Sequence, residues 1–173
     1  MTNPDAARFE AIWQSSYAPV FGFVARRCHP DRAADLVEET FLAAWRRLDD
    51  CPPDPRPWLF GIARGILAND HRGLRRAEAL RKRLQSFAVD TTAPLNEPPG
   101  GGTASDAFAA LRPKEREAVA LVAWDDLTTV EAARVAGCSE ATFRVRLHRA
   151  RKHLQAALAA PVASPPATGE EAT

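Results

Sequence analysis

The chain has 173 residues, of which 46% are hydrophobic and 26% charged, and its formal net charge is only +1. This composition allows one domain or two small ones with real cores, and the total charge alone does not indicate nucleic acid. The three cysteines and four histidines have neither disulfide-framework nor metal-ligand spacing, and no hydrophobic run has the length of a membrane span or a secretory signal. We therefore expect a protein of the reducing cytoplasm that needs no metal and no other cofactor.

The charge is distributed unevenly along the chain. Residues 1–83 hold 14 bases and 11 acids, and residues 112–159 hold nine bases and six acids. Between them, residues 84–111 contain three acids, no base and clustered proline and glycine, which predicts a flexible acidic linker. Residues 160–173, rich in Ala, Pro, Thr and Glu, read as a disordered tail. The sequence thus predicts two mildly basic modules on one chain.

The first predicted helix ends before His29-Pro30-Asp31 and has a broad apolar face. Its large side chains keep helical spacing over four turns and should form core, not a cofactor site: Phe9, Ile12, Trp13, Tyr17, Val20, Phe21 and Val24.

A second helix should begin at Pro30 or Asp31 and run through DRAADLVEETFLAAWRRL. Its interior face is predicted to consist of Ala34, Val37, Phe41, Ala44 or Trp45, and Leu48. Acids gather near its start and Arg46 and Arg47 near its end, as the helix dipole favours. Taken alone, the pattern is that of an ordinary amphipathic helix at the protein surface.

Residues 49–57 contain four prolines and predict a loop. A third helix is predicted in PWLFGIARGILANDHRGLRR, and its buried side is expected to consist of Trp58, Leu59, Ile62, Ile66 and Leu67. From Arg72 to Arg83 six bases face one acid, which makes a second cationic surface. Such a run of charges usually marks only a solvent-exposed face. Its occurrence beside a second DNA-binding module favours a role in nucleic-acid binding.

Residues 128–154 predict two short helices around a glycine turn. Thr128 and Glu131 have the spacing of a capping box, Gly137 suits the positive φ of a tight turn, and Ser139 can cap the helix that follows. In that second helix one apolar stripe should face the interior: Phe143, Leu147, Ala150 and Leu154.

The opposite face of the same helix is strongly basic. Between Ser139 and Leu154 there are five Lys or Arg residues against one acid. The outward positions are Ala141, Arg144, Val145, His148, Arg149 and Lys152, with Arg146 and Arg151 at the sides. A solvated face would explain the charge alone, but the caps, the turn and the stripe together favour a helix-turn-helix that binds duplex DNA.

With both modules described, the order of motifs resembles an extracytoplasmic-function (ECF) sigma factor, over almost the whole chain. DLVEETFLAAWRRL and PWLFGIARGILANDHRGLRR are similar to sigma region 2, and LRPKEREAVALVAWDDLTTVEAARVAGCSEATFRVRLHRARKHL is similar to region 4. The resemblance implies an all-α fold of two small helical domains joined by the linker. It also implies a non-catalytic factor that binds RNA polymerase core and directs it to promoters.

The resemblance implies a role for particular residues of the first module. It assigns contact with the polymerase β′ clamp to Asp35, Leu36, Glu38, Glu39, Thr40 and Trp45. It assigns the opening of the −10 element and the binding of its single strand to the loop from Asp49 and Asp50 to Arg56, and to Asn69, His71, Arg72, Arg75 and Arg76. Trp58 and Phe60 are candidates for base stacking, although core packing is the simpler role.

For the second module, the resemblance implies that the basic helix reads the −35 duplex. Ala141, Arg144, Val145, His148 and Arg149 would approach bases, and Thr142, Arg146 and Arg151 phosphates. Val145, where a small polar residue is common, suits a thymine methyl. The implied partners are polymerase core through its β′ clamp and β flap, promoter DNA and an anti-sigma protein, with no membrane contact. The linker acids Asp90, Glu97 and Asp106 either imitate a nucleic-acid backbone or belong to a plain tether.

The alternative is an autonomous helix-turn-helix regulator that binds DNA without polymerase core. It would dimerise through residues 112–158, which needs an exposed apolar seam that the sequence does not offer. An enzyme is disfavoured because no phosphate-binding glycine motif, nucleophile elbow or metal-ligand set is present.

Overall fold

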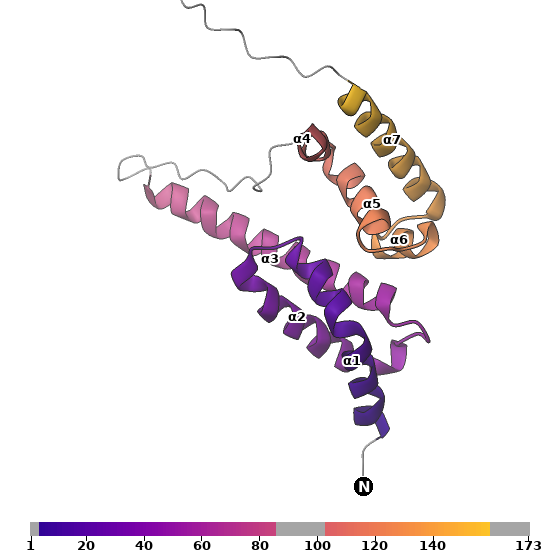
Figure 1. Cartoon of the computed structure of the whole chain (residues 1–173). Helices are drawn as coiled ribbons and strands as arrows, with labels where there is room; N and C mark the ends of the chain where they lie inside the picture. Colours follow the sequence, from indigo (N-terminus) through magenta and orange to yellow (C-terminus); the bar gives the residue numbers. More distant parts are fainter. Residues whose placement is uncertain (1–3, 86–102, 160–173) are drawn as a thin grey trace, which may run out of the picture.

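The structure is a computed structural model that describes residues 4–85 and 103–159 (Figure 1). Within these two ranges the chain forms seven α-helices and one short 3-10 helix, and no strand. The fold is therefore all-α, as predicted. No helix of the described residues is long and apolar enough to cross a membrane.

The N-terminal unit is a three-helix bundle. It consists of α1 (Pro4–Ala25), α2 (Pro30–Trp45), the 3-10 helix η1 (Leu48–Asp50) and α3 (Arg56–Gln85), and each α-helix packs against the other two. Val20, Val37 and Leu59, one from each helix, are fully buried. The rings of Phe23 and Phe60 stack with centroids 4.5 Å apart, so Phe60 is core.

The structure corrects the predicted inner faces of α1 and α2. On α1, Tyr17 and Phe21 are exposed, whereas Phe23 is buried. On α2, Ala34 is exposed, whereas Ala33 and Leu36 are buried. The reason is that each helix packs against two others, so its buried face is turned toward the groove between them and not toward a single partner.

The C-terminal unit has four helices. They are α4 (Thr103–Ala109), α5 (Pro113–Ala123), α6 (Thr129–Val135) and α7 (Glu140–Ala159), and α7 packs against the other three. The predicted linker was too long at both ends, because α3 continues to Gln85 and α4 occupies residues 103–109. Ala107 and Leu111 are buried, which gives α4 a place in the core. Asp106 thus lies in a helix; Asp90 and Glu97 lie outside the described residues.

The two units are in contact along α3 and α6. Figure 1 shows α6 facing the N-terminal half of α3, and the buried apolar side chains form one continuous cluster from Val20 of α1 to Leu147 of α7. Leu59 and Ile66 of α3 and Ala132 of α6 belong to this cluster. The predicted modules are therefore joined by packing as well as by the chain between them.

Candidate nucleic-acid and polymerase interfaces

The turn between α6 and α7 has the predicted geometry. The backbone N–H of Glu131 donates to Thr128 Oγ1 over 3.3 Å and the backbone N–H of Thr128 donates to Glu131 Oε2 over 2.8 Å, which completes the capping box. Hydrogen bonds from the Thr128 hydroxyl and backbone N–H lower the pKa of Glu131. Gly137 has φ 64°, and Ser139 accepts from the N–H of Thr142 over 3.2 Å. The capped helix, the glycine turn and the second cap are confirmed.

α7 has one buried face and one open face. Phe143, Leu147 and Ala150 are buried and Leu154 is half-buried, as predicted. On the open side the exposed residues are Ala141, Thr142, Arg144, Val145, His148, Arg149, Arg151 and Lys152, and Arg146 is half-buried. Because the stripe packs inward, the basic side points away from the domain.

The bases of α7 have few partners within the protein. Arg144 Nη1 lies 3.9 Å from Glu140 Oε1, and the Arg144 side chain is 71% exposed. Arg146 donates to Cys138 Sγ over 3.4 Å. Within residues 4–85 and 103–159, Arg149 and Arg151 make no hydrogen bond or ion pair to another side chain or to the backbone. Their guanidinium groups can therefore bind an external acceptor without first breaking an internal contact.

The residues expected at the −10 element lie in two separate places. Asp49 and Asp50 are in η1, and Arg56, at the first turn of α3, donates to Asp126 O over 2.9 Å. The strand-binding set begins 13 residues later at Asn69, about 20 Å along the helix at about 1.5 Å per residue. The two groups could contact successive nucleotides, but they do not form one cluster.

The strand-binding set is further divided by the helical repeat. Asn69, Arg72 and Arg76 share one face of α3, whereas His71 and Arg75 lie on another. His71 Nε2 lies 3.0 Å from Arg27 O, and Arg75 donates to His71 O over 3.2 Å. All five side chains are exposed, but the two groups lie on different sides of the helix, and within the first group Arg72 donates to Asn69 Oδ1.

The face of α2 expected to bind polymerase is narrower than predicted. Asp35, Glu38 and Glu39 are exposed. Leu36 and Thr40 are core residues, 2% and 0% exposed, and Thr40 Oγ1 donates to Leu36 O over 2.7 Å. Their assignment to a contact surface is wrong because they lie on the inward side of the helix.

A residue that the sequence reading did not select completes this face. Leu42 is 57% exposed and Trp45 41% exposed. Together with Glu38 they line a shallow apolar groove of about 240 Å³ between α1 and α2, whose other walls are Phe9, Trp13 and Phe41. The spacing of Glu38, Leu42 and Trp45, i, i+4 and i+7, was the available signal.

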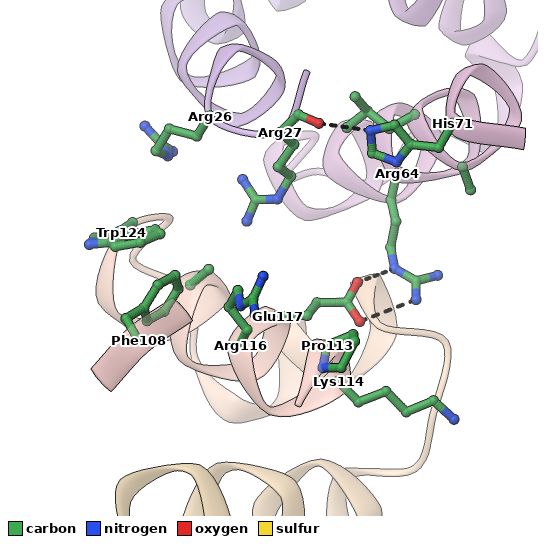
Figure 2. A pocket seen from close by; sticks show the side chains of 13 residues that line it. Arg26, Arg27, Arg64, His71, Phe108, Pro113, Lys114, Arg116, Glu117 and Trp124 are labelled. Carbon is green, nitrogen blue, oxygen red and sulfur yellow. Dashed lines mark hydrogen bonds and ion pairs between the residues drawn. The ribbon is translucent and has the colours of Figure 1, made fainter. Parts of the chain in front are cut away.

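The junction between the two units contains ion pairs that sequence reading did not anticipate. Arg26 and Arg27, at the end of α1, both donate to Asp125, whose side chain is fully buried. Figure 2 shows Arg64 of α3 reaching Glu117 of α5, with Nε 2.5 Å from Oε1. The hydrogen bond from Arg64 to Glu117 raises the pKa of the guanidinium. No local pattern links residues 26 and 125, so only the fold could identify this pair.

A cleft of about 510 Å³ lies beside these pairs. It is bounded by the end of α1, by α3 and by α5, and the rings of Phe108 and Trp124 close one side with centroids 4.6 Å apart (Figure 2). Within the described residues, no group of three or more His, Cys, Asp and Glu side chains could hold a metal ion.

Comparison with known proteins matches each unit to a sigma-factor family model. The Sigma-70 region 2 model matches residues 12–77, and the Sigma-70 region 4 model matches residues 104–154. The second match begins inside α4, in agreement with its place in the C-terminal unit.

Several curated proteins are similar over most of the chain. The ECF RNA polymerase sigma factor EcfG of Rhodopseudomonas palustris (strain TIE-1) is 33% identical over 74% of this chain and 72% of that protein. The RNA polymerase sigma factor CarQ of Myxococcus xanthus is 30% identical over 85% of this chain and 87% of that protein.

Solved structures share the fold. CnrH in complex with the cytosolic domain of CnrY matches with a TM-score of 0.60 and 25% identity, over 87% of this chain and 86% of that one. The sigma factor RpoE in complex with the anti-sigma factor NepR from Bartonella quintana has a TM-score of 0.59 and 23% identity, over 87% and 96% of the chains.

Proposed function

The chain belongs to the extracytoplasmic-function (ECF) family of RNA polymerase sigma factors, and from this premise we propose that it directs core polymerase to promoters by binding the −35 duplex with α7 and the opened −10 strand with α3. The factor is non-catalytic and acts in the cytoplasm, where bacterial polymerase works. The open basic face of α7 is the observation that carries the proposal.

At the −35 element, α7 would lie in the major groove. Arg144 and Arg149 are placed for base edges or nearby phosphates, and Arg151 for phosphate. Val145 is 49% exposed in the middle of this face and cannot donate a hydrogen bond. It is suited to a thymine methyl, which predicts a thymine preference at one −35 position.

At the −10 element, α3 supplies an electropositive track and η1 a bordering loop. The exposed face with Asn69, Arg72 and Arg76 favours the unpaired strand, because cations and amide groups bind its backbone and bases once they are separated. Binding that is available only to the open strand shifts the melting equilibrium, and no bond chemistry is required.

Core polymerase would bind the outer side of α2. Asp35, Glu38 and Glu39 provide a charged rim, and Leu42 and Trp45 provide the apolar centre beside them. An apolar centre with a polar rim is the usual form of a protein interface. CnrH was solved in complex with the cytosolic domain of CnrY. We infer that this chain also binds a second protein, an anti-sigma partner that shields such faces.

The proposal is tested by gel filtration with purified core polymerase. The wild-type chain should co-elute with core, and Glu38→Lys/Glu39→Lys should not, with an unchanged circular dichroism spectrum. The matched control is Glu10→Lys/Asp106→Lys, which makes the same charge change at exposed positions elsewhere and should still co-elute.

The outcomes separate the function from the site. A wild-type chain that never co-elutes with core but binds duplex DNA supports the autonomous regulator and contradicts the proposal. Normal co-elution of the Glu38→Lys/Glu39→Lys variant leaves the function standing and refutes the assignment of the α2 face.

A further inference from the structure

Asp70 occupies the last inward-facing position of α3. It lies four residues after the buried Ile66, and its side chain is only 9% exposed. Four residues further on, Leu74 is 52% exposed. From Leu74 to Lys82, the free half of α3, every side chain except that of Glu78 is exposed, and Figure 1 shows this part of the helix extending beyond α1 and α2. Asp70 therefore marks the point at which α3 leaves the bundle.

A carboxylate on the inward side of a helix is costly unless it is paired. Asp70 Oδ1 accepts a hydrogen bond from Arg32 Nη2 over 2.8 Å. Asp70 Oδ2 is also buried and has no hydrogen-bond partner within residues 4–85 and 103–159. An apolar side chain at this position would avoid the cost of the unpaired oxygen. A residue that departs in this way from the packing of its helix is expected where the fold serves binding and not stability alone.

Arg32 holds the carboxylate from a rigid support. It belongs to the first turn of α2, which begins with Pro30, and its backbone N–H donates to His29 O over 2.9 Å. Burial raises the pKa of the Cys28 thiol, and the nearby Asp70 carboxylate raises it further. The start of α2 and the turn before it thus both lie close to α3 at Asp70.

The next residue of α3 is held from another side. His71 Nε2 lies 3.0 Å from Arg27 O (Figure 2), and it is the donor, because a carbonyl oxygen can only accept. Adjacent side chains of an α-helix point about 100° apart, so Asp70 and His71 contact two different sides of the bundle. Together they restrict the rotation of α3 about its axis and the direction of its free half.

The side chains proposed for the −10 strand lie directly beside these two contacts. Asn69 precedes Asp70, and Arg72 and Arg76 follow on the same exposed face as Asn69. Arg76 is six residues from Asp70, about 9 Å at about 1.5 Å per residue, so a change of about 10° in the direction of the helix would move it by about 1.5 Å. Binding sites need their side chains held within about 0.5 Å. The direction of α3 at Asp70 thus decides how this face meets successive nucleotides.

We propose that Asp70 and His71 are positioning residues for the −10 strand. Neither contacts the DNA: they fix α3 against the start of α2 and the end of α1, and the exposed face that carries Asn69 binds the nucleotides. This role rests on the proposed function, and it removes His71 from the residues that bind the strand directly.

The direction of α3 is tested in the free, full-length chain by double electron–electron resonance. Spin labels are attached at Ala18→Cys of α1 and Ala79→Cys of the free half, both exposed positions, and the native cysteines are replaced by alanine. This background should give one narrow distance distribution. Arg32→Met/Asp70→Leu, which replaces the pair with apolar side chains, should broaden or shift the distribution at unchanged helix content.

The matched control removes the neighbouring exposed pair. His29 Nδ1 lies 3.3 Å from Asp31 Oδ2, and His29→Met/Asp31→Leu makes the same kind of change in the same turn. It should leave the distance distribution as it is. His71→Leu should change the distribution less than Arg32→Met/Asp70→Leu, because His71 is exposed, and it keeps the test valid if the double variant fails to fold.

The effect on recognition is measured by fluorescence anisotropy with core-bound factor and the −10 non-template strand of a promoter mapped from transcripts of core with this chain. Arg32→Met/Asp70→Leu should weaken strand binding about 10-fold, the size of one specific base contact, and lower the preference for the mapped bases. Binding of core and of the −35 duplex should stay the same. Arg32→Lys, which keeps a cation beside Asp70, should retain part of the preference.

The stability of the same variant separates positioning from a merely structural role. Replacement of an inward ion pair by apolar side chains is often neutral or stabilising, so the free energy of unfolding of Arg32→Met/Asp70→Leu should stay the same or rise while strand binding falls. A merely structural pair would make strand binding follow stability.

Equal distance distributions in the background and in Arg32→Met/Asp70→Leu would overturn the positioning role. A changed distribution with unchanged strand affinity and base preference would overturn its link to the −10 element. Failure of the wild-type chain to bind core would refute the proposed function, and with it the role at the −10 strand, whereas the distance measurement would still decide whether the pair fixes the direction of α3.

Discussion

The two cationic surfaces of this protein, on α7 and on α3, look alike in sequence but differ in the structure. Arg149 and Arg151 of α7 make no hydrogen bond or ion pair within the described ranges. On the α3 surface, Arg72 donates to Asn69 and Arg75 to His71 O, and nearer the start of the helix Arg56 and Arg64 bind groups of region 4. Further along α3, Arg81 pairs with Glu78 over 2.9 Å. A count of bases therefore does not distinguish a surface that is free to bind from one that is partly used within the fold.

The difference follows from how each helix is surrounded. α7 packs on α4, α5 and α6 along one side only, which leaves its basic side open. α3 packs against α1, α2 and α6, so its bases point in several directions and some of them meet carboxylates. We therefore expect the basic side of α7 to bind DNA without the loss of internal contacts, whereas Arg56 and Arg64 of α3 already have partners within the fold.

The largest effect is expected at the open face of α7. Arg149→Ala should weaken binding of a duplex carrying the mapped −35 element by about 1–3 kcal/mol if the contact is bidentate to a base. Lys114→Ala, an exposed change on α5, should have little effect in the same fluorescence-anisotropy titration. Unchanged affinity and base preference in Arg149→Ala would exclude it from base recognition.

The helix starts of the two regions provide the next comparison. Thr128→Ala removes the side chain that caps α6 and should lower the free energy of unfolding by about 0.5–2 kcal/mol. His29, the N-cap residue of α2, makes no side-chain cap hydrogen bond, so His29→Ala should be close to neutral. Urea unfolding followed by circular dichroism measures both; equal losses would show that the cap of α6 has no special role.

A stabilising change is expected on the exposed face of α3 that carries Asn69. Gly65 is exposed within the helix, and a Cβ added there meets nothing within 4 Å. Gly65→Ala should raise the free energy of unfolding by about 0.5–1 kcal/mol, because alanine has the higher helix propensity. Binding of the mapped −10 non-template strand measures the effect on function. A loss of binding with increased stability would show that the close approach of DNA requires glycine.

The smallest effect concerns the acid side of the capping box. The pKa of Glu131 is lowered in the folded protein from its ordinary value of 4.5, so the contribution of its ionised form is complete above about pH 4.5. That contribution is lost as the pH falls through the lower, folded value. The stability difference between wild type and Glu131→Gln should therefore be constant near neutral pH and shrink below pH 4.5. A difference that grows on acidification would contradict this assignment.

The sequence predicted local features of the fold better than long-range ones. The capping box at Thr128, the turn at Gly137 and the stripe through Phe143 depend on neighbouring residues, and all three are confirmed. The inner face of α2 was partly wrong, and α4 was read as linker because seven residues rich in alanine give little periodic signal. Its burial against α7 arises only in the folded unit.

The candidate sites show the same contrast between local features, which the sequence predicted, and long-range contacts, which it did not. The outward face of α7 could be assigned from helical periodicity, and the exposed residues match it. Leu36 and Thr40 were assigned by motif position, which does not report the direction of a side chain. The pairing of Arg26 and Arg27 with Asp125 joins distant segments, and neither partner has a local signature.

Sequencing the 5′ ends of transcripts made by purified core with this chain added tests the central claim most directly. The account predicts a defined set of start sites that share one −35 and one −10 sequence, and Arg144→Ala/Arg149→Ala should lose starts that depend on the −35 element while the variant still binds core. Start sites with no common upstream sequence, or an unchanged set with this variant, would contradict the claim that α7 selects the promoter.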